Sequence, residues 1–148
     1  MTRTVYRRPP GPLPGLPAAT TRTVQPTDDA ALADLVERAC AGTADEHLGG
    51  NGDGAAEIAS WRPNAVPHAS FVIADAGLLA ASLISQSEGE LWLAYVITHP
   101  DHKNRGLGTA VVAASLAALD AHVFAGVADG NTPSEKLLTR LGFSPVRR

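Results

Sequence analysis

The sequence predicts one mixed α/β domain, and three observations point to it. Apolar residues recur at helical spacing in residues 27–40 and 107–119. Three apolar runs between residues 71 and 98 are separated by glycine-containing turns, which is typical of an antiparallel meander. The second helical segment separates the third run from a fourth at 123–128, so these two strands can pair in parallel. A chain of 148 residues can bury about two thirds of its unfolded surface in one core.

The first 20 residues are expected to lie outside this domain. Residues 9–17 are rich in proline, which removes amide donors and fixes φ, so they cannot form a helix or a central strand. We therefore expect a flexible proline-rich extension over residues 1–20 and a folded domain over 21–148. A proline-rich ligand for a partner domain is an alternative interpretation of the same residues.

The domain is predicted to begin with a short strand at 23–25 and a helix that Thr27 caps. Two aspartates in the first turn favour a helix N-terminus. The buried face of this helix is predicted to consist of Ala31, Leu32, Leu35, Val36 and Ala39. A glycine-rich, acidic stretch follows at 42–54, and a second short helix is predicted at 55–61.

The remaining elements follow from turn and cap signals. The meander is predicted to have its strands at 71–74, 78–85 and 91–98, and the strand at 123–128 follows the second long helix. The last helix is predicted to have Thr132 as its N-cap, Pro133 at its first position and Glu135 in a capping box. Residues 144–148 leave room for one short strand at most.

Composition excludes several classes of function. The formal net charge of −3 argues against a nucleic-acid partner held by bulk charge. No apolar run approaches the ~20 residues of a membrane span, and the charged N-terminus lacks the apolar core of a secretory signal. A cytoplasmic location is the expectation that follows. The single cysteine, Cys40, excludes an internal disulfide and a cysteine metal cage, and we expect it to be a small buried apolar residue.

The most informative segment is 98–109, a basic, glycine-containing turn between a strand and a helix. Free N–H groups at a helix N-terminus are partly positive and bind phosphate, and glycines let a ligand approach the backbone. The segment does not match a Walker loop, and Val111 stands where a dinucleotide-binding loop has its third glycine. A tight turn with solvated basic residues is the alternative interpretation of the glycine pair alone.

Three motifs resemble the GNAT family of acyl-CoA-dependent N-acetyltransferases. Lys103-Asn104-Arg105-Gly106-Leu107-Gly108 resembles the family signature Gln/Arg-x-x-Gly-x-Gly/Ala. Asn131 followed by Leu141-Gly142-Phe143 resembles a second family segment, and residues 24–32 resemble the first strand and helix. The resemblance covers residues 21–146 and implies the GNAT fold, an antiparallel meander plus a parallel strand pair flanked by helices, here with a shortened or missing C-terminal strand. It also implies acetyl transfer from acetyl-CoA to a primary amine of a small molecule, peptide or protein.

The resemblance assigns the binding of acetyl-CoA, a co-substrate, and implies no metal. The pyrophosphate is expected on the turn and the pantetheine arm along the preceding strand. The expected binding residues are Val96, Ile97, Thr98, Lys103, Asn104, Arg105, Gly106, Leu107, Gly108, Thr109, Asn131 and Ser134. Lysine at position 103 departs from the family's glutamine or arginine and cannot make arginine's two-pronged phosphate contact. Asn131 has an alternative interpretation as a turn residue that bonds its own backbone.

The catalytic residues do not follow from the resemblance. Leu138 stands where many members have a proton-donating tyrosine, and Gly126 where some have a glutamate base. Replacement candidates are Glu90, Tyr95 and His99 on the fourth strand of the family fold. Two alternatives stay open: the thiolate leaves without an acid, or catalysis is lost and the chain is an acyl-CoA-binding sensor or regulatory module.

Two further expectations concern the acceptor side. Asp45, Glu46, Asp53 and Glu57 lie in the region that covers the acceptor in this family, and they favour a cationic acceptor or form a solvated loop. The short C-terminus predicts an acceptor pocket that is open, or completed by a second subunit in a homodimer, or completed by the N-terminal extension.

Overall fold

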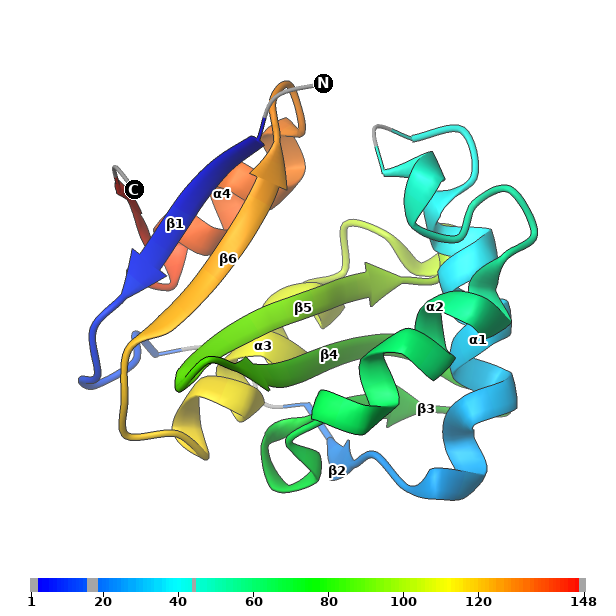
Figure 1. Ribbon diagram of the computed structural model, residues 1–148, viewed down its shortest axis with the longest axis horizontal. Helices are drawn as coiled ribbons and strands as arrows, with labels where there is room; N and C mark the ends of the chain where they lie inside the picture. Colours follow the sequence, from blue (N-terminus) through cyan, green and yellow to red (C-terminus); the bar gives the residue numbers. More distant parts are fainter. Residues whose placement is uncertain (1–2, 16–18, 44, 147–148) are drawn as a thin grey trace.

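The computed structural model describes residues 3–15, 19–43 and 45–146. One seven-stranded sheet, in the order β2-β3-β4-β5-β6-β1-β7, runs through the molecule, and helices cover both of its faces (Figure 1). The strands are β1 (Arg3–Arg8), β2 (Arg22–Thr23), β3 (Phe71–Ala74), β4 (Leu78–Ser87), β5 (Glu90–Thr98), β6 (Val123–Ala128) and β7 (Ser144–Val146). The α-helices are α1 (Asp29–Cys40), α2 (Gly54–Trp61), α3 (Leu107–Ala117) and α4 (Thr132–Arg140).

The mixed α/β fold class is confirmed. Strands β3, β4 and β5 form the predicted antiparallel meander, and β6 pairs in parallel with β5 after the α3 crossover. The limits of β3 and β6 agree with the prediction, and β7, with three residues, is the shortened C-terminal strand.

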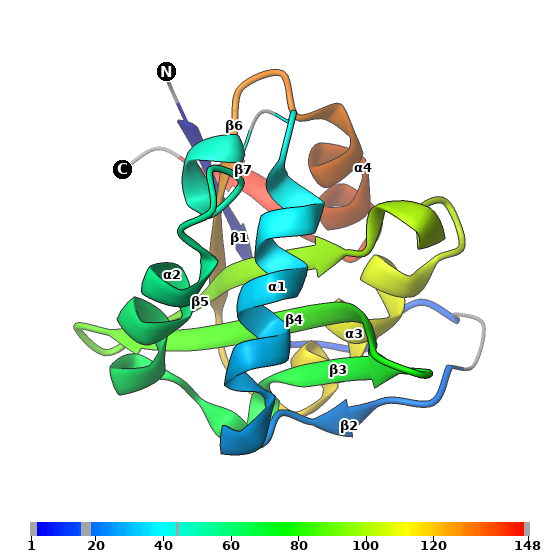
Figure 2. The same ribbon diagram turned by 90° about the vertical axis from the view of Figure 1, so that its right-hand side faces the viewer.

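Two apolar clusters lie on opposite faces of the sheet. Helices α1 and α2 pack over the β3–β5 part of one face, through residues such as Leu35, Val36 and Trp61. Helices α3 and α4 pack on the other face, where Leu116 and Leu138 belong to one cluster with residues of β5, β6 and β1. Figure 2 shows α1 and α2 on one side of the sheet and α3 and α4 on the other. Cys40 is 5% exposed within the first cluster, as predicted.

The expectation of a flexible extension over residues 1–20 is wrong for residues 3–8, which form β1. This strand pairs antiparallel with β6 from Arg3 opposite Ala128 to Arg8 opposite Val123. Its other edge pairs with β7, so β1 is an interior strand. The physical reason is the run of strand-forming residues at positions 4–6, whose Tyr6 is 7% exposed in the core.

The proline-rich segment that follows behaves as predicted in one respect, since residues 9–15 form neither helix nor strand. Leu13 nevertheless packs against the core. Residues 1–2 and 16–18 of the expected extension lie outside the described residues.

Three details of the helices differ from the prediction. Helix α1 is preceded by a 3-10 turn (Pro26–Asp28), so its N-cap is Asp28 rather than Thr27. Within α1, Ala33 rather than Ala31 is buried. Both oxygens of Asp28 accept hydrogen bonds from the Arg22 guanidinium, at 2.8 and 2.9 Å, and these bonds lower the pKa of this carboxyl group. Helix α4 is capped by Asn131 rather than Thr132.

Among the described residues, none of the helices has the length and apolarity to cross a membrane.

Candidate active site

The parallel strands β5 and β6 pair over a short distance and then separate. Their register contains two pairs, Leu91 with Val123 and Trp92 with Phe124. Just beyond, β5 contains a bulge, because Leu83 of β4 lies opposite Tyr95 while Ile84 lies opposite Leu93. A bulge adds an unpaired residue and bends the strand. The later part of β5 therefore turns away from β6 and leaves an opening in the sheet (Figure 1).

Helix α3 begins where β5 and the loop after it end. Its N-cap, Gly106, has φ +76° and no side-chain cap, and the amide of Ala110 donates to the Gly106 carbonyl at 3.0 Å. The first N–H groups of a helix have no partner inside it, so those of Leu107, Gly108 and Thr109 are available to a ligand. Asn104 also adopts a left-handed backbone, with φ +64°. This geometry fits the predicted pyrophosphate site.

Basic side chains surround this helix N-terminus. Lys103 and Arg105 are exposed, and Nη1 of Arg105 lies 2.8 Å from Nδ1 of His102. Gly108 has a different role, because a Cβ there would lie 3.2 Å from Leu137 and 3.3 Å from the hydroxyl of Thr98. The missing side chain thus lets α3 pack closely against β5 and α4. The loop, the end of β5 and α4 come together as predicted.

A small cavity, about 60 Å³ in volume, lies in the opening between β5 and β6. Val96 and Ile97 line it from β5, and Asn131 and Ser134 line it from the start of α4. The Asn131 side chain accepts a hydrogen bond from the Ser134 amide at 3.4 Å and donates one to Asp45 at 2.9 Å. The alternative interpretation of Asn131, a turn residue that bonds the local backbone, is confirmed, and its contact with acetyl-CoA stays a prediction.

A larger cavity of about 340 Å³ adjoins the first. Arg3, Leu48, Ala94 and Tyr95 line both cavities, so the two meet at the bulge of β5. The larger cavity extends toward α2 and the segment before it, and its other lining residues are His47, Ser60, Trp61, Asn64, Ser85 and Ser87.

Tyr95 is the one catalytic candidate of the three that lines either cavity. Its hydroxyl donates a 2.9 Å hydrogen bond to Oε1 of Glu57 on α2. Burial, followed by this bond and the charge of Glu57, raises the pKa of the phenol well above its usual value. Tyr95 is therefore protonated at neutral pH and acts as a donor.

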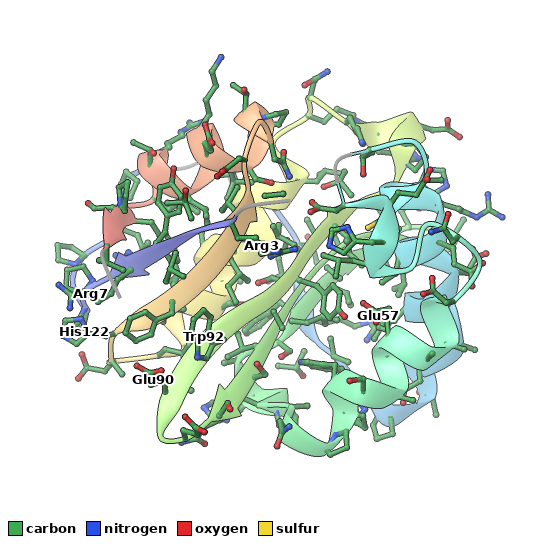
Figure 3. The ribbon with its side chains drawn as sticks, turned by 45° about the horizontal axis from the view of Figure 1, so that its top comes forward. Arg3, Arg7, Glu57, Glu90, Trp92 and His122 are labelled. Atoms are coloured by element: carbon green, nitrogen blue, oxygen red, sulfur yellow. The ribbon has the colours of Figure 1, made fainter. Side chains whose placement is uncertain are left out.

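The other two candidates lie elsewhere. Glu90 is near Trp92 and His122, away from Arg3 and Glu57 (Figure 3). His99 follows β5 and accepts a hydrogen bond from the Asp101 amide through Nδ1, at 3.1 Å. Its ring packs edge-on against His102, with 5.3 Å between centroids. His99 thus belongs to the basic loop, and nothing in this geometry gives Glu90 or His99 access to either cavity.

Arg3 is a site residue that the sequence did not indicate. Its Nη1 donates to the carbonyl of Gly126 at 3.2 Å, and Nη2 lies 3.8 Å from Oδ1 of Asp45. Arg3 brings the N-terminal segment to both cavities, and the three expectations for the acceptor pocket stay predictions. Leu138, which offers no proton, is 2% exposed and lines the small cavity.

The family model described as FR47-like protein matches residues 71–148, which is more than half of the chain. The chain belongs to the FR47-like family. This family is part of the GNAT acetyltransferases, so the predicted family and the assignment to the acyltransferases are confirmed at that level. No curated protein matches the FR47-like chain in sequence.

Solved structures show the same fold. A GNAT-family protein from Novosphingobium aromaticivorans has a TM-score of 0.69 at 17% identity, with 99% of this chain and 62% of that chain covered. A GCN5-related N-acetyltransferase from Sphaerobacter thermophilus has a TM-score of 0.69 at 21% identity, with 97% and 48% covered. The protein yncA from Salmonella typhimurium, solved with its cofactor acetyl-CoA, has a TM-score of 0.59 at 20% identity, with 83% and 78% covered. The FR47-like chain thus spans about half to three fifths of the length of the first two.

Proposed function

We propose that this chain transfers an acetyl group from acetyl-CoA to a primary amine. The observation that carries the proposal is the opening between β5 and β6, which lies beside the uncapped N-terminus of α3. The combination offers an open strand edge for an extended thioester arm and free amides for its phosphates. Family membership and the acetyl-CoA in the Salmonella protein support the same co-substrate.

The residues present fit acetyl-CoA. The amides of residues 104–109 would hold the pyrophosphate, and the main chain of residues 96–98 would hold the pantetheine arm. Asn131 and Ser134, which line the small cavity at the start of α4, would face this arm. Acetyl-CoA supplies an activated acyl group, a thioester whose carbonyl an amine can attack. Its reactive end would lie near the bulge, where the two cavities meet.

Proton transfer requires a group other than those the family often uses. We assign proton acceptance to Glu57, whose carboxylate lies behind the cavity wall and accepts a hydrogen bond from Tyr95, a residue of that wall. An acceptor ammonium loses one proton to this carboxylate, through the Tyr95 hydroxyl or through water, and becomes a nucleophile. Its nitrogen then bonds to the acyl carbon, the C–S bond breaks, and the second nitrogen proton ends on the departing thiolate. The products are an amide, a thiol and one released proton.

A second candidate function is an acyl-CoA-binding module without catalysis. Two observations favour it: Leu138 and Gly126 occupy the positions of the family's usual acid and base. In such a module the amides of residues 104–109 would still bind the co-substrate, while the acceptor cavity would have no catalytic use.

Two measurements on the whole chain separate these functions. Calorimetry with acetyl-CoA measures binding, and thiol release measures turnover over a panel of amino acids, amino-acid amides, polyamines and peptides. Binding together with amine-dependent thiol release supports the transferase. Binding without release from any amine supports the non-catalytic module, and absence of binding contradicts both.

A further inference from the structure

Arg3 places a positive charge where the two cavities meet. It is the first residue of β1, and its side chain lines both the small cavity and the larger one. Figure 3 shows Arg3 reaching from β1 toward β5, with Glu57 on the other side of β5. The cation therefore stands beside the position proposed for the thioester, on the acceptor side.

The described residues leave most of the hydrogen-bonding capacity of this guanidinium available. A guanidinium has five N–H donors, and among the described residues the Arg3 group donates one hydrogen bond, to the Gly126 carbonyl. Asp45 forms an ion pair with it at 3.8 Å, which balances part of its charge but is too long to use an N–H donor. That carboxylate instead accepts a 2.9 Å bond from Asn131. The side chain of Arg3 is 38% exposed, so a ligand in the cavity can reach it.

Gly126 makes room for this arrangement. A Cβ at position 126 would lie 3.3 Å from Nη1 of Arg3, which is tighter than ordinary van der Waals contact. A larger side chain there would displace the guanidinium from β6. Some family members carry a glutamate at the position of Gly126. In this chain the guanidinium of Arg3, from the neighbouring strand β1, lies against that glycine.

We propose that Arg3 binds a carboxylate of the acceptor, so that the acceptors are amino acids or other small amines bearing a carboxylate. This inference rests on the proposed acetyltransferase function. An arginine fork matches a carboxylate in two parallel hydrogen bonds. Glu57 lies behind the cavity wall that Tyr95 forms, so it would take the ammonium proton of the same molecule through the Tyr95 hydroxyl or water. Opposite charges on the two sides of β5 suit a molecule that carries both charges.

The phosphates of acetyl-CoA do not compete for this residue in the proposed arrangement. Their site is the N-terminus of α3, where Lys103 and Arg105 supply the cations. An acceptor with ammonium groups alone would have no group to place against Arg3. The charge at Arg3 therefore distinguishes an amino acid from a polyamine of similar length.

The test uses two conjugates of coenzyme A, each joined through an S-carbonylmethyl link to an amino group. One carries alanine with its free carboxylate, and the other carries alaninamide. Calorimetry measures the dissociation constants for the wild type, Arg3→Gln and the matched control Arg7→Gln. Arg7 is an exposed arginine on the same strand and lines neither cavity. Thermal melts check that each variant is folded.

For the wild type and Arg7→Gln, we expect the carboxylate conjugate to bind at least about tenfold more tightly than the amide. For Arg3→Gln, we expect this ratio to fall below about two while plain acetyl-CoA still binds as it does to the wild type. Equal affinity of the wild type for both conjugates, or a ratio unchanged in Arg3→Gln, overturns the inference. Failure of both conjugates to bind overturns it as well.

The same proteins separate this inference from the proposed function. Thiol release is measured with alanine, leucine, their amides and spermidine. Release with the amides or spermidine but not with the amino acids leaves the transferase in place and overturns the role of Arg3. Silence with every amine contradicts the transferase, whereas the ratio of the two conjugate affinities still decides whether Arg3 binds a carboxylate.

Discussion

The hydroxyl of Tyr95 donates a hydrogen bond of 2.9 Å to Oε1 of Glu57, which joins the bulge of β5 to helix α2. The two residues come from segments far apart in the chain, and their bond places a carboxylate behind a phenol that lines both cavities. Among the described residues that line the opening, Leu138 and Gly126 carry no titratable group. The Tyr95–Glu57 pair is the acid–base group to which we assign proton transfer, with the phenol at the cavity wall and the carboxylate behind it.

Glu57→Gln is predicted to lower kcat by about a hundredfold, because a positioned general base contributes about 10²–10⁴ to a rate. The dissociation constant for acetyl-CoA should not change, since its proposed site lies at α3 and the end of β5. Thiol-release kinetics and calorimetry measure the two quantities. Asp53→Asn is the control, because it removes a nearby exposed carboxylate that lies outside both cavities. Full activity of Glu57→Gln would assign the proton transfer to another group.

The two tyrosines of the chain, Tyr6 and Tyr95, are predicted to ionise above the usual pKa of 10.0. Burial is the largest cause of the raised pKa in both, and neighbouring carboxylates add to it. At pH 10, near-ultraviolet absorbance should show less than half of the phenols ionised in the folded protein. In concentrated guanidinium chloride, about half should be ionised at that pH.

The same shifts predict how stability depends on pH. Above pH 10 the unfolded chain loses phenolic protons that the folded chain keeps, so the free energy of unfolding falls as pH rises. Below this range the contribution is fully present. Tyr95→Phe should make this alkaline decline shallower in urea unfolding measured from neutral to alkaline pH. An identical decline in wild type and variant would show that Tyr95 titrates normally.

Gly106→Ala is predicted to weaken acetyl-CoA binding, and Gly89→Ala is its control. Both glycines have a left-handed backbone, with φ of +76° and +79°, and an added Cβ would meet nothing within 4 Å at either position. Alanine in this conformation costs about 1 kcal/mol of stability, so both variants should be destabilised to a similar extent. Of the two, Gly106 is the N-cap of α3, whose first amides are proposed to bind the phosphates, whereas Gly89 lies in the β4–β5 turn.

The binding difference between these glycine variants is the decisive measurement. In Gly106→Ala the turn can escape the strain by leaving the conformation that binds phosphate. If restoring this conformation costs acetyl-CoA about the same 1 kcal/mol, its dissociation constant should rise about fivefold. It should stay at the wild-type value in Gly89→Ala. Equal weakening in both variants would indicate a general loss of stability instead of a phosphate site at α3.

Local signals account for the parts of the fold that the sequence predicts well. Strands β3 and β6 have the predicted limits because apolar runs and glycine turns are encoded within a few residues. The turn before α3 is equally local, since its glycines and its position between a strand and a helix are contiguous in the chain. These features suffice for the family, and the co-substrate end of the site that they indicate stays a prediction.

Non-local pairing accounts for the parts that the sequence does not predict. The prolines at residues 9–17 favour an extension without regular structure, and this outweighs the weak strand signal of Thr4-Val5-Tyr6, so the sequence does not predict β1. Its partners β6 and β7 lie at the other end of the chain. The contacts of Arg3 depend on that pairing. The bond between Tyr95 and Glu57 likewise requires α2 to fold over β5, which no spacing in the sequence indicates.

Arg8 is predicted to hold the two ends of the domain together. Its side chain is buried, and Nε donates to the Leu141 carbonyl at the end of α4, at 2.7 Å. Nη1 donates to the carbonyl of Pro9, and Nη2 donates to those of Gly11 and Pro12. One guanidinium thus joins β1, the proline-rich segment and α4. Methionine fills a similar volume but leaves these carbonyls without their charged donor.

Arg8→Met should therefore lower the free energy of unfolding by about 3 kcal/mol, because hydrogen bonds from a charged group contribute about 1.5–3 kcal/mol. Urea unfolding measures the loss, and Arg7→Met is the matched control on the same strand. Arg7 is exposed, so its substitution should change stability by no more than about 0.5 kcal/mol. Equal effects of the two substitutions would mean that the packing of β1 between β6 and β7, rather than the Arg8 hydrogen bonds, holds the N-terminal segment in the domain.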